Sequence, residues 1–127
     1  MSALARWALL ASLTVAACRA PRQNVDSAPA PEADNFSLTL NNHHLLDVNI
    51  FLQHDGQADR IATVTASTSR TMVLPLYMLG QGGTIRLIAE PIGDDSRYTT
   101  DILTVQPGQM VELNVENPIP RSNYSIQ

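Results

Sequence analysis

Cysteine and lysine are nearly absent from this chain of 127 residues, which has one cysteine, Cys18, and no lysine. A single cysteine excludes an internal disulfide and any metal site built from cysteines alone. Eight arginines against twelve acidic residues give a formal net charge of −4, and the calculated pI is about 5.1. Nucleic acid is therefore not expected as a partner, because binding phosphates requires clustered positive charge.

The sequence also lacks the short motifs that mark common catalytic sites. It has no G-x-S-x-G nucleophile turn, no H-E-x-x-H zinc motif, no phosphate-binding P-loop and no G-x-G-x-x-G dinucleotide motif. Residues 80–83 are rich in glycine, but neither a lysine nor a helical pattern follows them. Asp101 and Glu112 could flank a glycosidase cleft, yet any acidic domain offers such pairs. We therefore expect a protein that is not an enzyme and needs no cofactor.

An uncharged hydrophobic run covers residues 7–17, directly after Arg6. At eleven residues the run is too short for a membrane-spanning helix, which needs about 20 residues. It ends in the small residues Ala16 and Ala17 before Cys18. A positive start, a hydrophobic stretch of this length and small residues at the end are typical of a secretory signal peptide. Residues 1–17 are therefore expected to be removed.

The position of the only cysteine directly after Val15-Ala16-Ala17 resembles the lipobox of bacterial lipoproteins. The resemblance implies that the signal peptide is cut before Cys18, whose sulfur receives a diacylglycerol and whose amino group is acylated, with palmitate among the chains. Two or more acyl chains hold a protein stably on a membrane, so the membrane is the first expected partner. Arg19, in place of aspartate, favours the outer membrane if the cell is Gram-negative.

Residues 18–35 are expected to form the lipidated cysteine and a disordered tether. They contain three prolines and almost no large apolar side chains, so they cannot bury enough surface to offset the entropy of ordering the chain. Beyond them we expect one folded domain over residues 36–117. A C-terminal tail is expected over residues 118–127, because Pro118 and Pro120 end the last strand pattern.

Polar and apolar residues alternate along much of the domain, which is the pattern of half-buried β-strands. Polar or Gly- and Pro-containing turns separate the alternating segments, and Pro107-Gly108 fits the centre of a type II turn. Pro75 predicts an edge position for its strand, since proline cannot donate a hydrogen bond within a sheet. The expected strands cover residues 36–41, 46–53, 60–66, 71–76, 84–90, 99–105 and 110–115.

About seven short strands predict an all-β fold, a single small antiparallel β-sandwich. A second resemblance agrees: segments 47–52, 73–75, 85–87 and 105–109 are similar to those of immunoglobulin-like and transthyretin-like modules on bacterial envelope proteins. This resemblance covers about residues 36–117 and implies a fold class without any catalytic residue. The expected core contains Leu38, Val48, Ile50, Val64, Leu74, Ile85, Leu87, Val111 and Leu113.

His43, His44 and His54 are the only histidines. Adjacent residues of a strand point to opposite faces, so His43 and His44 could share an ion only across a turn. Asp47 or His54 would then complete a weak transition-metal site. Exposed loop residues without a metal are the alternative that we favour.

Aromatic side chains offer the best candidates for a contact surface. Phe51 is out of phase with its apolar neighbours and should point away from the core. There it marks either an apolar contact patch or a second half-buried face that the tether or the C-terminal tail covers. Tyr77 and Tyr98 flank expected loops. The favoured function is a non-catalytic, membrane-anchored envelope lipoprotein whose sandwich is a structural or protein-interaction module, with another envelope protein as partner. The alternative is a glycan- or peptidoglycan-binding module, which requires Tyr77 and Tyr98 to lie close together as a stacking platform.

Overall fold

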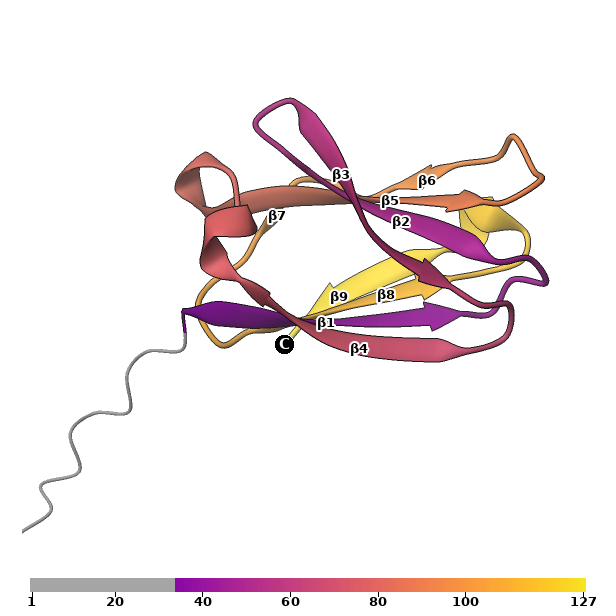
Figure 1. The fold of residues 1–127 in the computed structure, drawn as a ribbon, viewed down its shortest axis with the longest axis horizontal. Helices are drawn as coiled ribbons and strands as arrows, with labels where there is room; N and C mark the ends of the chain where they lie inside the picture. The colour runs from indigo at the N-terminus through magenta and orange to yellow at the C-terminus, as the bar shows by residue number, and fades with distance from the viewer. Residues whose placement is uncertain (1–33) are drawn as a thin grey trace, which may run out of the picture.

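The computed structural model describes residues 34–127, so the expected signal peptide, the lipidation of Cys18 and most of the expected tether lie outside the described residues. The described chain forms two sheets that pack face to face, which confirms the predicted all-β sandwich (Figure 1). Three 3-10 turns join strands: η1 (Leu76–Met78), η2 (Gln81–Gly83) and η3 (Ile119–Arg121). No helix in this part of the chain is long and apolar enough to cross a membrane.

The two sheets have different sizes. The smaller sheet has the strand order β4 (Ser69–Pro75), β1 (Asn35–Asn42), β8 (Met110–Val115) and β9 (Asn123–Ile126), with β1 and β8 parallel and the other neighbours antiparallel. The larger sheet has the order β3 (Gln57–Val64), β2 (Val48–His54), β5 (Thr84–Pro91) and β6 (Tyr98–Thr99), and β7 (Leu103–Thr104) also pairs with β5. The edge position predicted from Pro75 is confirmed, because β4 lies at the end of its sheet.

The core lies between the two sheets. Even-numbered residues of β1 and β2 are buried, except His54 at the end of β2, and odd-numbered ones are partly exposed, as the alternating direction of strand side chains requires. All nine residues predicted for the core are buried. Phe36, Leu40 and Leu52 are buried with them.

The described chain has nine strands rather than about seven, and one reason is a break at Thr100. The backbone N–H of Thr100 donates to the carbonyl oxygen of Leu87. The N–H of Leu87 then donates to the Thr100 hydroxyl at 3.0 Å instead of to a backbone carbonyl. This side-chain hydrogen bond replaces one step of the ladder, so the single strand expected over residues 99–105 becomes β6 and β7.

The second difference lies at the C-terminus, where residues 118–127 were expected to form a tail. The structure instead places η3 and β9 there, and β9 pairs with β8. Tyr124 and Ile126 pack against the core, and Gln127 exchanges backbone hydrogen bonds with Met110. At the other boundary, Asn35 begins β1 rather than ending the tether.

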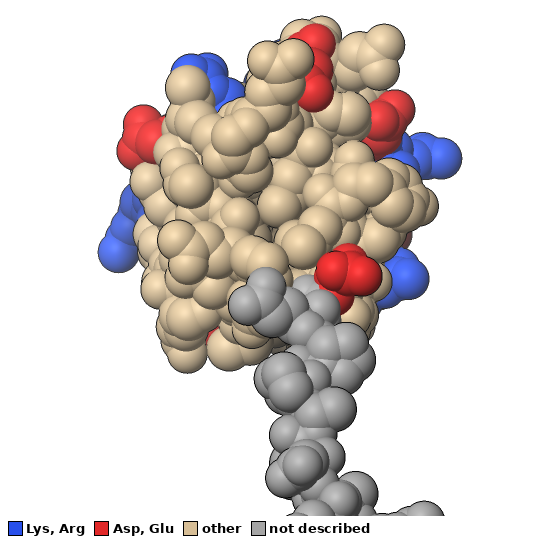
Figure 2. Space-filling model, turned by 90° about the vertical axis from the view of Figure 1, so that its left-hand side faces the viewer, with Lys and Arg blue, Asp and Glu red and all other residues tan. Residues whose placement is uncertain are grey.

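The strands run between two ends of the sandwich. We call the end that contains Asp34, η1, η2 and the turn at residues 106–109 the proximal end, because the described chain begins there (Figure 1). The distal end contains the loops at residues 43–47, 65–68, 92–97 and 116–122. Most of the surface visible at the proximal end is uncharged (Figure 2).

Candidate functional site

Three exposed aliphatic side chains lie on two neighbouring loops of the distal end. Leu45 is 72% exposed and Leu46 is 36% exposed in the loop between β1 and β2, and Ile92 is 50% exposed just after β5. The two loops are joined, because the N–H of Ile92 donates to the carbonyl oxygen of Asp47 at 2.8 Å. We call these three side chains the distal patch.

Buried Asn42 fixes the loop that presents the two leucines. Its side-chain Nδ2 lies 3.0 Å from the carbonyl oxygens of Leu46 and Val64 and 3.1 Å from that of Thr65. Its Oδ1 accepts the backbone N–H of His44 at 2.9 Å. One amide side chain therefore ties the loop to the end of β3, and burial strengthens these bonds by excluding water.

His44 holds the same loop from within. Its ring is buried, and its Nδ1 accepts the N–H of Leu46 at 3.1 Å. Asp47 ends the loop by accepting the N–H of Ala66 at 2.9 Å. Because these contacts fix His44, Leu46 and Asp47, Leu45 and Leu46 are presented on a preorganised turn.

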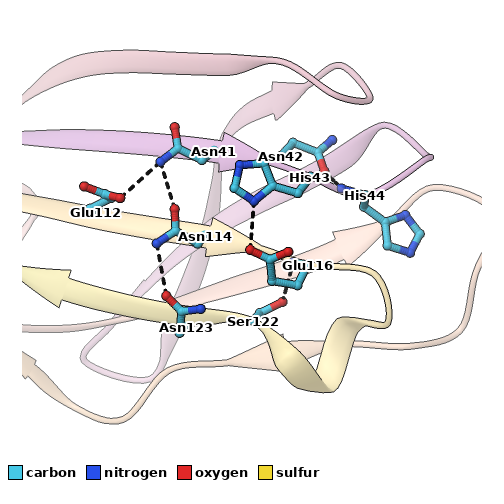
Figure 3. A network of polar contacts seen from close by, with 9 residues as sticks. All are labelled: Asn41, Asn42, His43, His44, Glu112, Asn114, Glu116, Ser122 and Asn123. Atoms are coloured by element: carbon cyan, nitrogen blue, oxygen red, sulfur yellow. Dashed lines mark hydrogen bonds and ion pairs between the residues drawn. The ribbon is translucent and has the colours of Figure 1, made fainter.

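A row of polar side chains leads from the sheet surface to this end of the molecule (Figure 3). On the outer face of the smaller sheet, Asn41 donates to Glu112 at 3.2 Å and to Asn114 at 2.8 Å, and Asn114 donates to Asn123 at 3.0 Å. The row links β1, β8 and β9 by side chains as well as by backbone. Such cross-strand pairs stabilise a sheet modestly.

The row continues beyond the ends of the strands. His43 Nδ1 lies 2.8 Å from the carboxylate of Glu116, and the N–H of Glu116 donates to the Ser122 hydroxyl at 2.9 Å. His43 and His44 thus have different surroundings, one on the surface and one buried. The two rings serve separate structural contacts.

Acidic residues border the distal patch. Asp94 accepts the backbone N–H of Ser96 at 3.0 Å and the Ser96 hydroxyl at 2.9 Å. These bonds hold the pKa of Asp94 below its usual 3.8, and the bond from the backbone N–H contributes most. Asp47 and Asp95 are exposed in the same loops. The loops that carry the patch therefore present exposed carboxylates, while Arg97 in the second loop is paired with Glu90.

The three aromatic residues expected to form a contact surface lie apart. Phe51 points outward from β2 and is partly exposed, opposite Ile88 of β5. Tyr77 lies in η1 at the proximal end and is 83% exposed. Tyr98 lies in β6, at the edge of the larger sheet, and packs against the core. The structure therefore does not assemble Tyr77 and Tyr98 into one stacking platform.

His54 lies far from the other two histidines in the fold, at the end of β2 that faces the proximal end. Its two ring nitrogens each lie 3.6 Å from a different carboxylate, Nδ1 from Asp55 and Nε2 from Asp59. Carboxylates on opposite sides of one ring cannot converge on a single ion. Within residues 34–127, no group of three or more His, Cys, Asp or Glu residues could hold a metal.

An open cavity of about 270 Å³ lies beside His54. Its lining comes from the β2–β3 turn, the start of β5 and the exposed Ile102. His54 Nδ1 is buried there without a hydrogen-bond partner in the described chain. Thr84 in the lining donates its hydroxyl to the carbonyl oxygen of Gln81 at 3.0 Å rather than to His54.

Tyr124 closes one side of the sandwich. Its hydroxyl donates to the Asp101 carboxylate at 3.0 Å, and this hydrogen bond is the main cause that raises the pKa of Tyr124 above its usual 10.0. Burial raises the pKa of Tyr98 above 10.0 as well, with the Asp101 charge adding to it. The two tyrosines flank the same carboxylate from β6 and β9.

We expect the free energy of unfolding to fall as the pH rises above 10.0, the usual tyrosine pKa. In that range the unfolded tyrosines release their protons while folded Tyr98 and Tyr124 retain them, so the unfolded state binds fewer protons. Tyr124→Phe should make this fall shallower, and Asp101→Asn should do the same. Urea unfolding at about pH 8 and about pH 11 measures the slope. An unchanged slope in both variants would show that this contact is not the source.

Comparisons with known proteins find little similarity. No family model and no curated protein matches the chain. A solved structure described as a crystal structure of a Gram-negative toxin has 12% identity and a TM-score of 0.40, over 75% of this chain and 23% of that one. Another, described as a trapped toxin, has 12% identity and a TM-score of 0.37, over 73% and 23%. The chain thus spans under a quarter of either protein, and a likeness this low says nothing about function.

Leu45, Leu46 and Ile92 were not among the contact residues predicted from the sequence. The alternating pattern placed Leu46 at the start of a strand, although the structure places it in the loop before β2. A usable signal was present for Ile92, which stands between Pro91 and Gly93, and for Leu46, which precedes Asp47, because the chain is expected to be exposed beside turn-forming residues.

Proposed function

We propose that this protein is a non-catalytic lipoprotein of the bacterial cell envelope, anchored through lipid on Cys18, that binds another envelope protein through the distal end of its sandwich. The observation that carries the proposal is the distal patch. Its aliphatic side chains are exposed on loops held by buried hydrogen bonds, at the end opposite Asp34. A domain attached through Asp34 would present this end away from its anchor.

The distal patch has the physical properties of a protein contact. Fully burying one aliphatic side chain contributes about 1.5–3 kcal/mol, so three together could anchor a small interface. Fixed loops also lower the entropy cost of binding. Because Asp47, Asp94 and Asp95 border the patch, the best partner surface is apolar with arginine or lysine at its edge.

Binding of glycan or peptidoglycan is the second candidate. The observation in its favour is the row of amide and carboxylate side chains on the smaller sheet, since such groups can pair with sugar hydroxyls. These side chains already bond to one another, and the tyrosines that would stack on sugar rings lie at different places. We therefore rank protein binding first.

Two isoleucines provide a matched pair for testing the interface. Ile92 is 50% exposed at the distal end and Ile102 is 61% exposed beside the cavity near the proximal end. The full-length lipoprotein should be crosslinked in its native membrane and its partners identified by mass spectrometry. Ile92→Asp should reduce recovery of the main partner about tenfold or more, as expected if a charge enters an apolar contact, and Ile102→Asp should not.

Cys18→Ala supplies the unanchored control for the same experiment. If the partner is recovered as well with Ile92→Asp as with the unchanged protein, the interface lies elsewhere. Crosslinks centred on β4 would indicate strand addition at that edge. Enriched glycan fragments without a protein partner would favour the second candidate. Recovery no greater than with Cys18→Ala would reject a stable anchored complex.

A further inference from the structure

The proximal end of the sandwich has an unusual lack of charge. No charged residue occurs between Thr71 and Ile85, the segment that includes η1 and η2, or between Ile102 and Val111, which includes the turn at residues 106–109. Both segments meet the start of β1: the N–H of Leu76 donates to Asp34, and the N–H of Gly108 donates to Asn35. In Figure 2, charged side chains lie mostly around the rim of this end.

Tyr77 lies in η1, within the uncharged segment between Thr71 and Ile85. It is 83% exposed, whereas its neighbours Leu76, Met78 and Leu79 are partly buried against the core. The N–H of Leu79 donates to the carbonyl oxygen of Leu76 at 3.0 Å and closes the η1 turn. Three apolar side chains thus hold the turn on the core, while the single aromatic side chain points to solvent. The Tyr77 side chain therefore contributes little to the packing of the core.

From these observations we propose that the proximal end rests on the membrane that carries the Cys18 lipid, with Tyr77 at the level of the lipid headgroups. Tyrosine is favoured at that depth because its ring is apolar and its hydroxyl can remain hydrated. The inference rests on the proposed lipid anchor and adds an orientation: η1 faces the bilayer and the distal patch faces away from it.

The short chain between the anchor and the domain allows even a weak contact between the proximal end and the membrane to be populated. Asp34 is sixteen positions after Cys18, and a chain of that length reaches at most about 55 Å when fully extended. Because the anchored domain cannot move farther than this from the membrane, its effective concentration at the membrane surface is on the order of millimolar. One exposed tyrosine on an uncharged surface is then enough to populate the contact.

The charge at this end selects the kind of lipid surface. The acidic residues near this end include Asp34, where the described chain begins, and Asp55, whose carboxylate accepts the N–H of Gln81. Asp59 lies beside His54 at the same end of β2. Arg86 is exposed on the flank of the larger sheet. Since no basic cluster faces the bilayer, the contact should form on zwitterionic phosphatidylcholine and depend little on salt.

Tryptophan fluorescence provides the test, because Trp7 is the only native tryptophan. The lipidated protein carrying Tyr77→Trp is reconstituted into phosphatidylcholine vesicles with brominated acyl chains, which quench nearby tryptophan. A Trp7→Phe background keeps any precursor that retains residues 1–17 from contributing to the emission. Ile92→Trp is the matched control at the distal end. The emission of Tyr77→Trp should fall by about half or more, and that of Ile92→Trp should stay unchanged.

Flotation of the vesicles separates the two proposals. The orientation is supported if both variants float with the vesicles and only the emission of Tyr77→Trp is quenched. Flotation without quenching of Tyr77→Trp, or with equal quenching of Ile92→Trp, overturns the orientation and leaves the anchor in place. Failure to float, with no lipid mass on Cys18, overturns the anchor and the orientation with it. Circular dichroism verifies that each variant is folded.

Discussion

Phe36→Ala is expected to lower the free energy of unfolding by about 3–5 kcal/mol, because it deletes a buried aromatic ring and leaves a cavity. Phe36 is fully buried at the start of β1, opposite Leu74 of β4, in the core between the sheets. A domain of this size has a total stability of about 5–15 kcal/mol. The variant should therefore lose a large part of its stability, which urea unfolding followed by circular dichroism measures.

Phe51→Ala is the matched control, because the chain has only two phenylalanines and both lie in strands. Phe51 points outward, partly exposed, between Arg60 of β3 and Ile88 of β5. Losing its cross-strand contacts should cost about 1 kcal/mol. Equal losses for the two variants would contradict the assignment of inward and outward faces.

The sequence was sufficient for the fold class and the core because burial on one face of a sheet forces a two-residue period. That period is clear in β1, β2 and β8, where buried and partly exposed residues alternate. It allowed all nine predicted core residues to be placed correctly. The edge position of β4 followed from the chemistry of Pro75, which lacks the N–H that an interior strand must donate.

The C-terminal strand escaped prediction for a physical reason. β9 has four residues, of which only Tyr124 and Ile126 contact the core. Two apolar residues after a proline-containing segment are too few to establish a period. The strand forms because β8 offers an unpaired edge in the folded molecule, and that edge depends on contacts distant in sequence.

The distal site was only partly predictable. Three histidines in a small domain drew attention to a metal, yet His44 acts as a buried acceptor for the loop and His43 pairs with Glu116. The central residue, Asn42, stands in a polar run that reads as an exposed turn. Its acceptors Val64 and Thr65 lie more than twenty residues away along the chain, so no local pattern could have indicated them.

Asn42→Ala should lower the free energy of unfolding by about 2–4 kcal/mol, the second large effect that we expect. The change removes the donor shared by the carbonyl oxygens of Leu46, Val64 and Thr65 and the acceptor for the His44 N–H. The carbonyl oxygen of Thr65 keeps its bonds from the N–H and hydroxyl of Thr68. The buried bonds to the Val64 carbonyl and from the His44 N–H are lost without replacement, and an unsatisfied buried group costs more than the lost bond alone. Urea unfolding measures the loss.

Asn41→Ala is the matched control, since the same residue type stands one position earlier on the outer face of the sheet. Asn41 is partly exposed and bonds to Glu112 and Asn114, and water can replace those partners. Its loss should therefore cost about 1 kcal/mol or less. Equal losses in the two variants would show that the distal loop does not depend on the buried amide.

Asn42→Ala also tests whether the order of the loop matters for recognition. The variant retains every side chain of the distal patch but removes the bonds that fix Leu45 and Leu46 in place. Under conditions where it remains folded, we expect faster hydrogen exchange at the N–H groups of His44 and Leu46 and weaker crosslinking to the partner, because binding must then pay the cost of ordering the loop. Unchanged crosslinking with faster exchange would mean that the partner recognises the side chains without needing a preorganised turn.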